Sequence, residues 1–471
     1  MNFGLESYVP YVLYLLAITS LLLSIFWRPI TGLFFLLPLL PLQTIRYRIN
    51  DLPLGGSLIG VMLVGIAIGL ARQGKPVLPK SNWTPLIGVY GIFTYVSLWL
   101  GSIYLNDEFP LPGSRRFGTW QEYMVMPALL LIVAALKPTK REMQAIVALI
   151  CLSILVADKS FWNTVSGSDF SSYSDGLRQE GGTLGYAGIN GLAAFAAQSS
   201  AFLLALAGFE RRTWARLALY ALGIFSAVCL MYSLSRGGYA AFVVGCFLVA
   251  LLKQRKLLVL IVILACTWTA WAPPAVRQRI EMTYDPQSRS LDNSANTRLE
   301  LWDNAMEVFH SNAILGAGFN TYEYMNLNKR TDGGVGYYQD THNYFVKILV
   351  ETGVVGLILF LLLVGKLFFE GFQVFRRSDD PFFASLGLGL VAWLTCVIVA
   401  NFFGDRWSFL QVNAYMWVIA GMVAHMKTIE EPVAVPEQAE GDDAPSIHEP
   451  EDTEMTLEDF SQPEWLPRNG V

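Results

Sequence analysis

Apolar stretches long enough to cross a bilayer recur along the whole chain and are separated by short polar segments. A helix that spans the hydrocarbon core needs about 17–25 mainly apolar residues. The pattern therefore predicts an all-α polytopic membrane protein with about 12–13 transmembrane helices. We place these helices at 9–27, 30–43, 54–71, 84–105, 121–137, 142–158, 187–209, 214–234, 237–252, 256–272, 342–370, 382–403 and 408–426. The second stretch is short and holds Pro38 and Pro41, so we expect a broken or re-entrant segment.

One long polar segment, 273–341, interrupts this pattern. Polar loops of this length are uncommon and are usually functional or disordered. Thr297 and Glu300 have the spacing of a helix capping box. Apolar residues follow at helical spacing at Leu299, Trp302, Met306 and Phe309. We therefore predict a short amphipathic helix over 297–311 and expect the chemistry to lie in or beneath this loop.

The composition agrees with a membrane protein, because 15% of the residues are charged and 54% are hydrophobic, whereas soluble domains carry roughly 25% charged residues. After position 429 there are 13 acidic residues and one basic residue, so the rest of the chain carries +7 within a total of −5. We expect 427–471 to be a disordered acidic cytoplasmic tail, because it holds too few apolar residues to bury a core.

Lysine and arginine clusters indicate the orientation, since cytoplasmic loops carry an excess of both. Six clusters fall on one side, at 72–80, 137–141, 211–216, 253–256, 376–377 and 427. The opposite side, which includes loop 273–341, would then face away from the cytoplasm. Arginines on that side break the charge bias, and a residue that breaks a rule indicates a functional role.

Three such arginines are candidates for binding an anion. Arg298 falls in the first turn of the predicted amphipathic helix, where a phosphate would suit both the helix N-terminus and the guanidinium. Arg236 lies in the tight turn 235–238, where a cation is costly unless it is paired. Arg178 precedes Gly181, Gly182 and Gly185, whose backbone N–H groups could approach an anion. The alternatives are a solvated Arg298, a snorkelling Arg236 and an ordinary glycine-rich loop.

His342 is the candidate general base or hydrogen-bond donor, because imidazole titrates near neutral pH. If it lies on the helix that follows, it shares a face with Phe345, Val346, Leu349, Gly353 and Gly356. The alternative is a histidine that caps or packs at the membrane interface. Glu351 lies four residues after Lys347, which favours an ion pair within the helix over a direct catalytic role.

Other motifs are missing from the sequence. There is no Walker A, HExxH or GxSxG sequence and no clear metal constellation, so an ATP-driven pump or a protease is disfavoured. The five cysteines lie in apolar runs without CxxC spacing, which indicates buried packing residues. We predict neither a metal nor a cofactor.

Three segments together resemble the O-antigen ligase/polymerase family of bacterial membrane glycosyltransferases. They are SLSRGGYAAFVVG at 233–245, RLELWDNAMEVFHSNAILGAGFNTY at 298–322 and THNYFVKILVETGVVGLILF at 341–360. An upstream segment, RQEGGTLGYAGINGLA at 178–193, is similar to the family's Arg-Gly-Thr…Asn segment, with Ile189-Asn190 where Pro-Asn is usual. The resemblance implies N-terminal transmembrane helices over 1–172 and a catalytic region over 173–426.

The resemblance also implies a reaction. A glycan would pass from an undecaprenyl-diphosphate carrier to an acceptor hydroxyl at the periplasmic face of the bacterial inner membrane, in one inverting displacement. Arg178, Arg236 and Arg298 would hold the diphosphate, and His342 would act on the acceptor. Asn190, Asn343 and Glu351 would support the site. The partners would be the lipid-linked oligosaccharide, a glycan or lipid-glycan acceptor, membrane lipids and other polysaccharide-assembly proteins, without nucleic acid.

The motifs do not separate a polysaccharide ligase from a repeat-unit polymerase. A polyprenyl-linked glycan flippase or a secondary transporter is the alternative from another class. A transporter needs ionisable or broken-helix sites near mid-membrane, whereas the unusual charges here lie at the outer ends of spans. A non-catalytic scaffold that acts through the acidic tail is the third reading.

Overall fold

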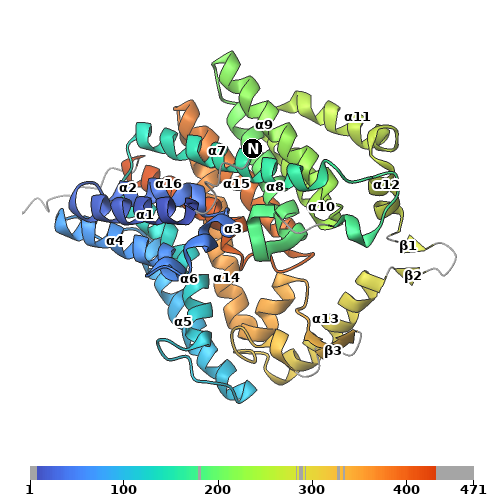
Figure 1. The fold of residues 1–471 in the computed structure, drawn as a ribbon, viewed down its shortest axis with the longest axis horizontal. Coiled ribbons are helices and arrows are strands. Elements are labelled where there is room, and N and C mark those ends of the chain that lie inside the picture. Colours follow the sequence, from blue (N-terminus) through green and yellow to red (C-terminus); the bar gives the residue numbers. More distant parts are fainter. Residues whose placement is uncertain are drawn as a thin grey trace, which may run out of the picture. The chain divides into compact units, whose positions relative to one another are not determined.

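The computed structural model describes residues 8–178, 182–282, 284–285, 290–291, 293–325, 329–332 and 335–430. This part is almost entirely helical (Figure 1). The first half contains α1 (Val9–Phe26), α2 (Ile30–Leu39), α3 (Gln43–Arg46), η2 (Tyr47–Ile49), η3 (Gly55–Ser57), α4 (Leu58–Arg72), α5 (Trp83–Leu105), α6 (Arg115–Leu136), α7 (Lys140–Val165), η4 (Asp175–Leu177), η5 (Gly182–Ala187), α8 (Gly188–Ala207) and α9 (Thr213–Tyr232). The second half contains α10 (Arg236–Leu252), α11 (Arg255–Trp271), α12 (Pro274–Glu281), β1 (Tyr284–Asp285), β2 (Ser290–Leu291), α13 (Asn293–Ser311), η6 (Tyr322–Tyr324), β3 (Lys329–Asp332), β4 (Val335–Tyr338), α14 (Tyr344–Arg377), α15 (Pro381–Asn401) and α16 (Leu410–Glu430).

Nine helices in the described residues are long and apolar enough to span a membrane, and counting two sharply bent pairs raises this to 11. One bent pair is α2 with 43–49, at 111°, which confirms the predicted break of the second stretch. The number is lower than the predicted 12–13. Two predicted spans correspond to α10, which has only 17 residues, and to α16, whose sequence is interrupted by Gln411, Asn413 and His425. The chain is nevertheless a multi-pass, all-α membrane protein.

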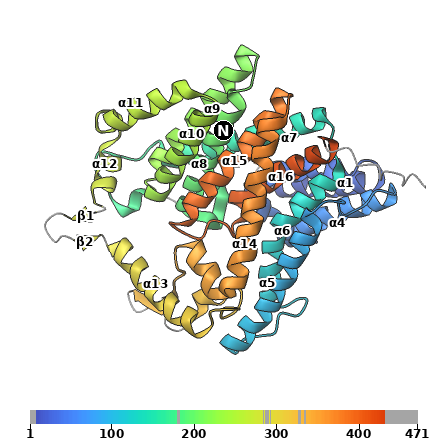
Figure 2. The same ribbon diagram turned by 180° about the vertical axis from the view of Figure 1, so that it is seen from behind.

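Helices α8, α10 and α15 pack against one another at the centre of the bundle (Figures 1 and 2). Every residue of α8 between Gly191 and Leu203 is buried, and most of them are small, so neighbouring helices can approach closely. On α10, a Cβ at Gly245 would lie 2.2 Å from the Cys396 Sγ of α15. The close packing brings the N-terminal end of α10 next to the first turns of α8.

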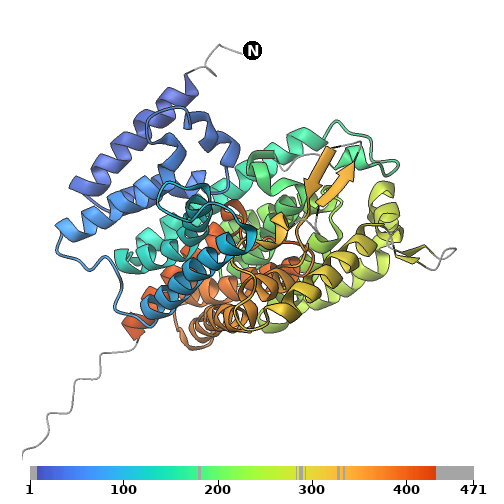
Figure 3. The ribbon, with the colours of Figure 1, turned by 90° about the horizontal axis from the view of Figure 1, so that it is seen from below.

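The polar segment before α14 contains two short antiparallel hairpins, β1–β2 and β3–β4, and the helix α13 (Figure 3). The predicted amphipathic helix is present, but it begins at Asn293 rather than at Thr297. Thr297 is therefore inside the helix, and the capping-box prediction is wrong. The buried stripe is Leu301, Ala305 and Val308. Leu299, which we predicted on the apolar face, is 46% exposed.

Helix α14 is kinked at Gly353, whose φ of 64° and ψ of −169° are not helical. The break leaves carbonyl groups that the loop after α13 satisfies. The backbone N–H of Ala317 donates to Val350 O at 2.9 Å, and that of Gly318 donates to Glu351 O at 2.8 Å. The kink therefore fastens the polar segment to the helix that follows it.

We predict that Gly353→Ala lowers the midpoint of thermal unfolding of the purified protein. A non-glycine residue at positive φ costs about 1–3 kcal/mol, and the added Cβ would lie 2.2 Å from Ile314 O. Gly365→Ala on the same helix is the matched control, because a Cβ there meets nothing within 4 Å. A Gly353→Ala protein as stable as the Gly365→Ala protein would contradict the role of the kink.

Candidate active site

A cavity of about 510 Å³ lies where α8, α10, α12, α13 and the segments before α14 and α16 meet. All three arginines that we selected from the sequence line it, together with Asn190 and His342. Two further arginines, Arg279 and Arg406, also line it. The complete lining is Arg178, Asn190, Ala194, Leu234, Ser235, Arg236, Gly237, Gly238, Arg279, Thr297, Arg298, Gln339, His342, Ala400, Phe403 and Arg406. Two predicted supporting residues, Asn343 and Glu351, are not part of the lining.

Asn190 joins two walls of the cavity. Its side-chain Oδ1 accepts a hydrogen bond from Arg178 Nη2 at 2.8 Å and one from Ser235 Oγ at 2.9 Å. Arg178 directly follows η4, Asn190 is in the first turn of α8, and Ser235 belongs to the turn before α10. Arg178 and Asn190, which both belong to the segment 178–193, are therefore in direct contact.

Arg236 is the first residue of α10, so the turn before this helix determines where its side chain begins. Leu234 in that turn has a φ of 56°. A Cβ at Gly238 would lie 2.8 Å from Ala193 Cβ, and one at Gly237 would lie 2.8 Å from Phe403 Cβ. The two glycines thus allow α10 to enter the cavity wall between α8 and the segment after α15.

The surrounding segments hold Arg279 and Arg298 in place. The Arg279 guanidinium lies 5.0 Å from the centre of the Tyr173 ring, and the Tyr173 N–H donates to Gln278 Oε1 at 2.7 Å. Arg298 lies on α13, one turn before Trp302, whose Nε1–H donates to Thr341 O at 2.8 Å. This bond ties the helix that carries Arg298 to the residue before His342.

His342 is not on helix α14, which corrects the helical face that we predicted for it. The helix begins at Tyr344, because the Asn343 side chain caps it by accepting from the N–H groups of Phe345 and Val346 at 3.0 and 3.3 Å. His342 lies before the cap with a φ of 52°. In this left-handed conformation His342 is part of the cavity lining.

Burial lowers the pKa of His342, and the positive charge of Arg298 lowers it further. Asp340 and Asp405 act in the opposite direction, and Arg406 adds to the lowering. The net direction keeps the imidazole neutral near pH 7, since its ordinary pKa is 6.5. A neutral imidazole can accept a proton, which a general base requires.

Arg406 is the strongest addition to the predicted site. Its backbone N–H donates to Asn401 Oδ1 at 2.9 Å, and that of Trp407 donates to the same atom at 2.9 Å. Burial lowers the pKa of Arg406 to about 10, and the group stays cationic at neutral pH. The topology predicted from the sequence puts Arg279 and Arg406 on the side opposite the lysine-rich clusters, like the arginines that we selected, so the same pattern could have indicated both.

Lys347 and Glu351 do not form the ion pair that their spacing predicted. The Lys347 ammonium instead pairs with Asp340 Oδ2 at 2.7 Å and Asp405 Oδ2 at 3.0 Å. The Glu351 carboxylate accepts the backbone N–H groups of 320–322 at 2.9, 3.0 and 3.1 Å. Both side chains therefore bond groups from other segments instead of bonding each other.

A second, smaller cavity of about 110 Å³ lies beside this network. Its lining includes the buried Lys347 and Glu351, and the exposed Thr119 and Glu122 from α6. Among the residues that the structure describes, no group of three or more His, Cys, Asp or Glu side chains is arranged to hold a metal ion in either cavity.

Residues 221–361 match the family model of O-antigen ligase. No curated protein sequence matches the chain. The matched segment contains Arg236, Arg279, Arg298 and His342, and the fold adds Arg178 and Arg406 from outside it. This match indicates ligase-type transfer of a glycan in a multi-pass membrane protein, with lipid-linked glycans as substrates. The match over residues 221–361 supports the O-antigen ligase/polymerase family.

Proposed function

We propose that this protein transfers a glycan from a polyprenyl-diphosphate carrier, undecaprenyl diphosphate, to a sugar hydroxyl of an acceptor. The reaction would take place at the periplasmic face of the bacterial inner membrane, with 273–341 outside and 427–471 inside. The observation that carries the proposal is the convergence of five arginines and one histidine on a single cavity. These residues come from five separate segments, 178–190, 235–238, 279–298, 339–342 and 400–406.

The arginines suit the leaving group. When the bond between the anomeric carbon and the diphosphate breaks, the diphosphate takes the electron pair and gains negative charge. Fixed guanidinium groups stabilise such charge without reorganising, and they bind phosphate oxygens with two parallel N–H donors. We assign Arg178, Arg236 and Arg298, with Arg279 and Arg406, to this role.

His342 suits the acceptor. The acceptor hydroxyl oxygen attacks the anomeric carbon as the carbon–diphosphate bond breaks, and its proton passes to the imidazole nitrogen of His342. A single displacement inverts the anomeric configuration. The region 173–426 would form the catalytic part behind the N-terminal helices of 1–172. Asn190 would support Arg178, Asn343 would position His342 by capping α14, and Glu351 would hold the loop 320–322.

The decisive experiment uses the purified full-length protein with a polyprenyl-diphosphate oligosaccharide as donor. Transfer to a second lipid or glycan acceptor would identify a ligase, and lengthening of the lipid-linked chain would identify a polymerase. Movement of intact donor between the leaflets of a liposome without either product would instead identify the alternative, a flippase.

The pH dependence of kcat/KM should show an acid limb below pH 6.5. His342 must be unprotonated to act as the base, and its pKa lies below the ordinary value of 6.5. Activity is therefore present at neutral pH and is lost as the pH falls through the lowered pKa. Removing the nearby positive charge with Arg298→Ala should move the limb to higher pH. A limb that lies above 6.5 in the wild type, or does not move in this variant, would contradict the assignment.

A further inference from the structure

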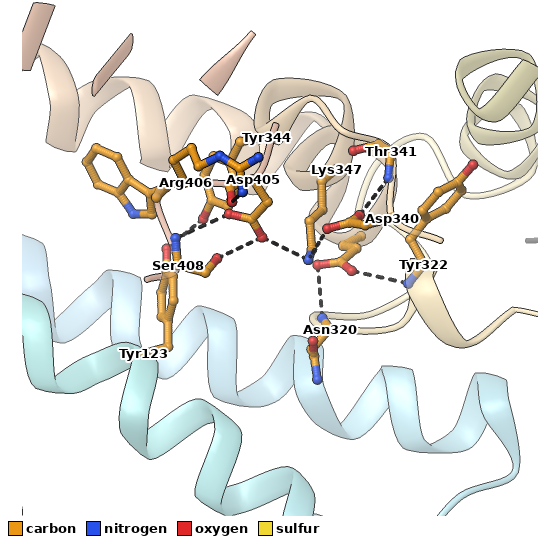
Figure 4. A network of polar contacts seen from close by, with 12 residues as sticks. Tyr123, Asn320, Tyr322, Asp340, Thr341, Tyr344, Lys347, Asp405, Arg406 and Ser408 are labelled. Atoms are coloured by element: carbon orange, nitrogen blue, oxygen red, sulfur yellow. Dashed lines mark hydrogen bonds and ion pairs between the residues drawn. The ribbon is translucent and has the colours of Figure 1, made fainter. Parts of the chain in front are cut away.

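Lys347 connects the two short segments that carry His342 and Arg406. It projects from the first turn of α14, and its side chain is only 10% exposed. Its ammonium group bonds Asp340 Oδ2 at 2.7 Å and Asp405 Oδ2 at 3.0 Å (Figure 4). Asp340 lies two residues before His342, and Asp405 immediately precedes Arg406. One buried cation therefore links the neighbours of two cavity residues that are 64 positions apart.

Each carboxylate is also fixed at its own end. Asp340 Oδ1 accepts the backbone N–H of Thr341 at 2.7 Å. Asp405 accepts the backbone N–H of Ser408 at 3.2 Å and the Ser408 hydroxyl at 3.0 Å. The two aspartates thus have little freedom to rotate, and the positions of their backbones follow the position of the Lys347 ammonium.

The backbone at His342 needs such an external restraint. A non-glycine residue at positive φ is unfavourable and persists only where its surroundings hold it. His342 has this conformation and lies outside the regular hydrogen bonding of α14. On its C-terminal side, Asn343 and Thr341 bond each other, with Thr341 Oγ1 donating to Asn343 O at 2.7 Å. On its N-terminal side, the ion pair of Asp340 with Lys347 is the corresponding anchor.

We propose that Lys347 is a positioning residue that sets the placement of His342 relative to Arg406. It does so by holding Asp340 and Asp405 together behind the wall of the cavity. The inference rests on the proposed function, in which His342 serves the acceptor and Arg406 serves the diphosphate. Lys347 itself does not line the larger cavity and touches neither reacting group.

The two aspartates allow the two halves of the link to be cut separately. Asp340→Asn weakens only the ion pair of Lys347 with the segment of His342, so it should lower kcat and leave the KM for the donor unchanged. Asp405→Asn weakens only the ion pair of Lys347 with the segment of Arg406, so it should raise the donor KM more than it lowers kcat. Lys347→Met removes both ion pairs, so it should lower kcat and raise the donor KM. The expected loss in kcat is about 10- to 100-fold, because a misplacement of roughly 1 Å has effects of this size.

Two further variants separate positioning from folding. Lys366→Met removes an ion pair on the same helix, in which Lys366 Nζ lies 2.7 Å from Glu370 Oε1. Because neither residue lines the cavity, this variant should leave both kcat and the donor KM unchanged. Lys347→Arg keeps the charge and should restore most of the activity, because the cavity of about 110 Å³ beside Lys347 leaves room for the larger side chain. Each variant is checked for a monodisperse elution profile in detergent.

The outcomes are distinguishable. The split between kcat and donor KM, with recovery in Lys347→Arg, would support the positioning role. Equal changes of both constants in the two Asn variants, or a Lys347→Met protein that behaves like Lys366→Met, would overturn it. If Lys347→Met does not fold, the Asn variants still decide, since the Asn amide oxygen remains an acceptor for the Lys347 ammonium. Lack of transfer by the wild type would overturn the proposed function and this inference together.

Discussion

Replacing His342 by alanine is expected to lower the turnover of glycan transfer by about 10²–10⁴-fold, the contribution typical of general acid–base catalysis. Donor binding should stay nearly unchanged, because the arginines that surround the cavity remain. The measurement is single-turnover transfer at saturating lipid-linked donor, with donor binding measured separately. The neutral state of the imidazole, which burial and Arg298 favour, is the physical basis of this expectation.

Two controls separate the chemistry of the ring from the backbone. His342→Asn removes the base but keeps a residue that tolerates positive φ, so it should be as inactive as His342→Ala without loss of stability. His310→Ala changes an exposed histidine of α13 whose ring contacts Met306 O and Phe309 of its own helix, and it should remain active. The assignment fails if His342→Asn retains turnover or if it loses donor binding.

Replacing Arg298 by alanine should weaken donor use by about 10–150-fold. A charge-assisted hydrogen bond to a phosphate is worth about 1.5–3 kcal/mol, and each 1.4 kcal/mol is roughly a tenfold change in affinity. Arg298→Lys should recover only part of this loss, since an ammonium lacks the planar pair of donors. The readout is the dissociation constant of the lipid-linked donor.

The helix α12 offers a matched pair for the same measurement. Arg279 lines the cavity, whereas Arg277 bonds Thr269 O at 3.1 Å and is not part of the lining. Arg279→Ala should therefore weaken donor binding, and Arg277→Ala should not. Equal effects of the two substitutions would mean that general positive charge, and not the cavity, attracts the donor.

The predicted ion pair between Lys347 and Glu351 was wrong, and the spacing of the two residues could not have shown why. Residues four apart on a helix are neighbours, and opposite charges there attract. In the fold, however, two aspartates from other segments reach Lys347, and three backbone N–H groups reach Glu351. Buried charges take the partners that satisfy them best, and for Glu351 those partners lie 29 to 31 residues away in the chain.

The position of His342 shows a similar limit. Apolar periodicity placed it on the following helix, but Asn343 is a stronger local signal, because Asn is among the preferred N-cap residues. Reading that cap would have started the helix after Asn343 and left His342 outside it.

By itself the sequence determined the membrane class, the broken second stretch, the polar segment before α14 and the choice of Arg178, Arg236, Arg298 and His342. These features can be read from short stretches of sequence. A membrane-spanning segment must be a long apolar helix, and a charged side chain in or near the bilayer costs free energy unless it is paired or functional. Only the tertiary structure decided that these residues share one cavity and that Arg279 and Arg406 join them. It also decided that Lys347 links the segments of His342 and Arg406. Such groupings depend on which helices pack together. Small residues such as Gly238 and Gly245 permit close packing between helices that are far apart in the chain, and a local sequence pattern does not show which helices these are.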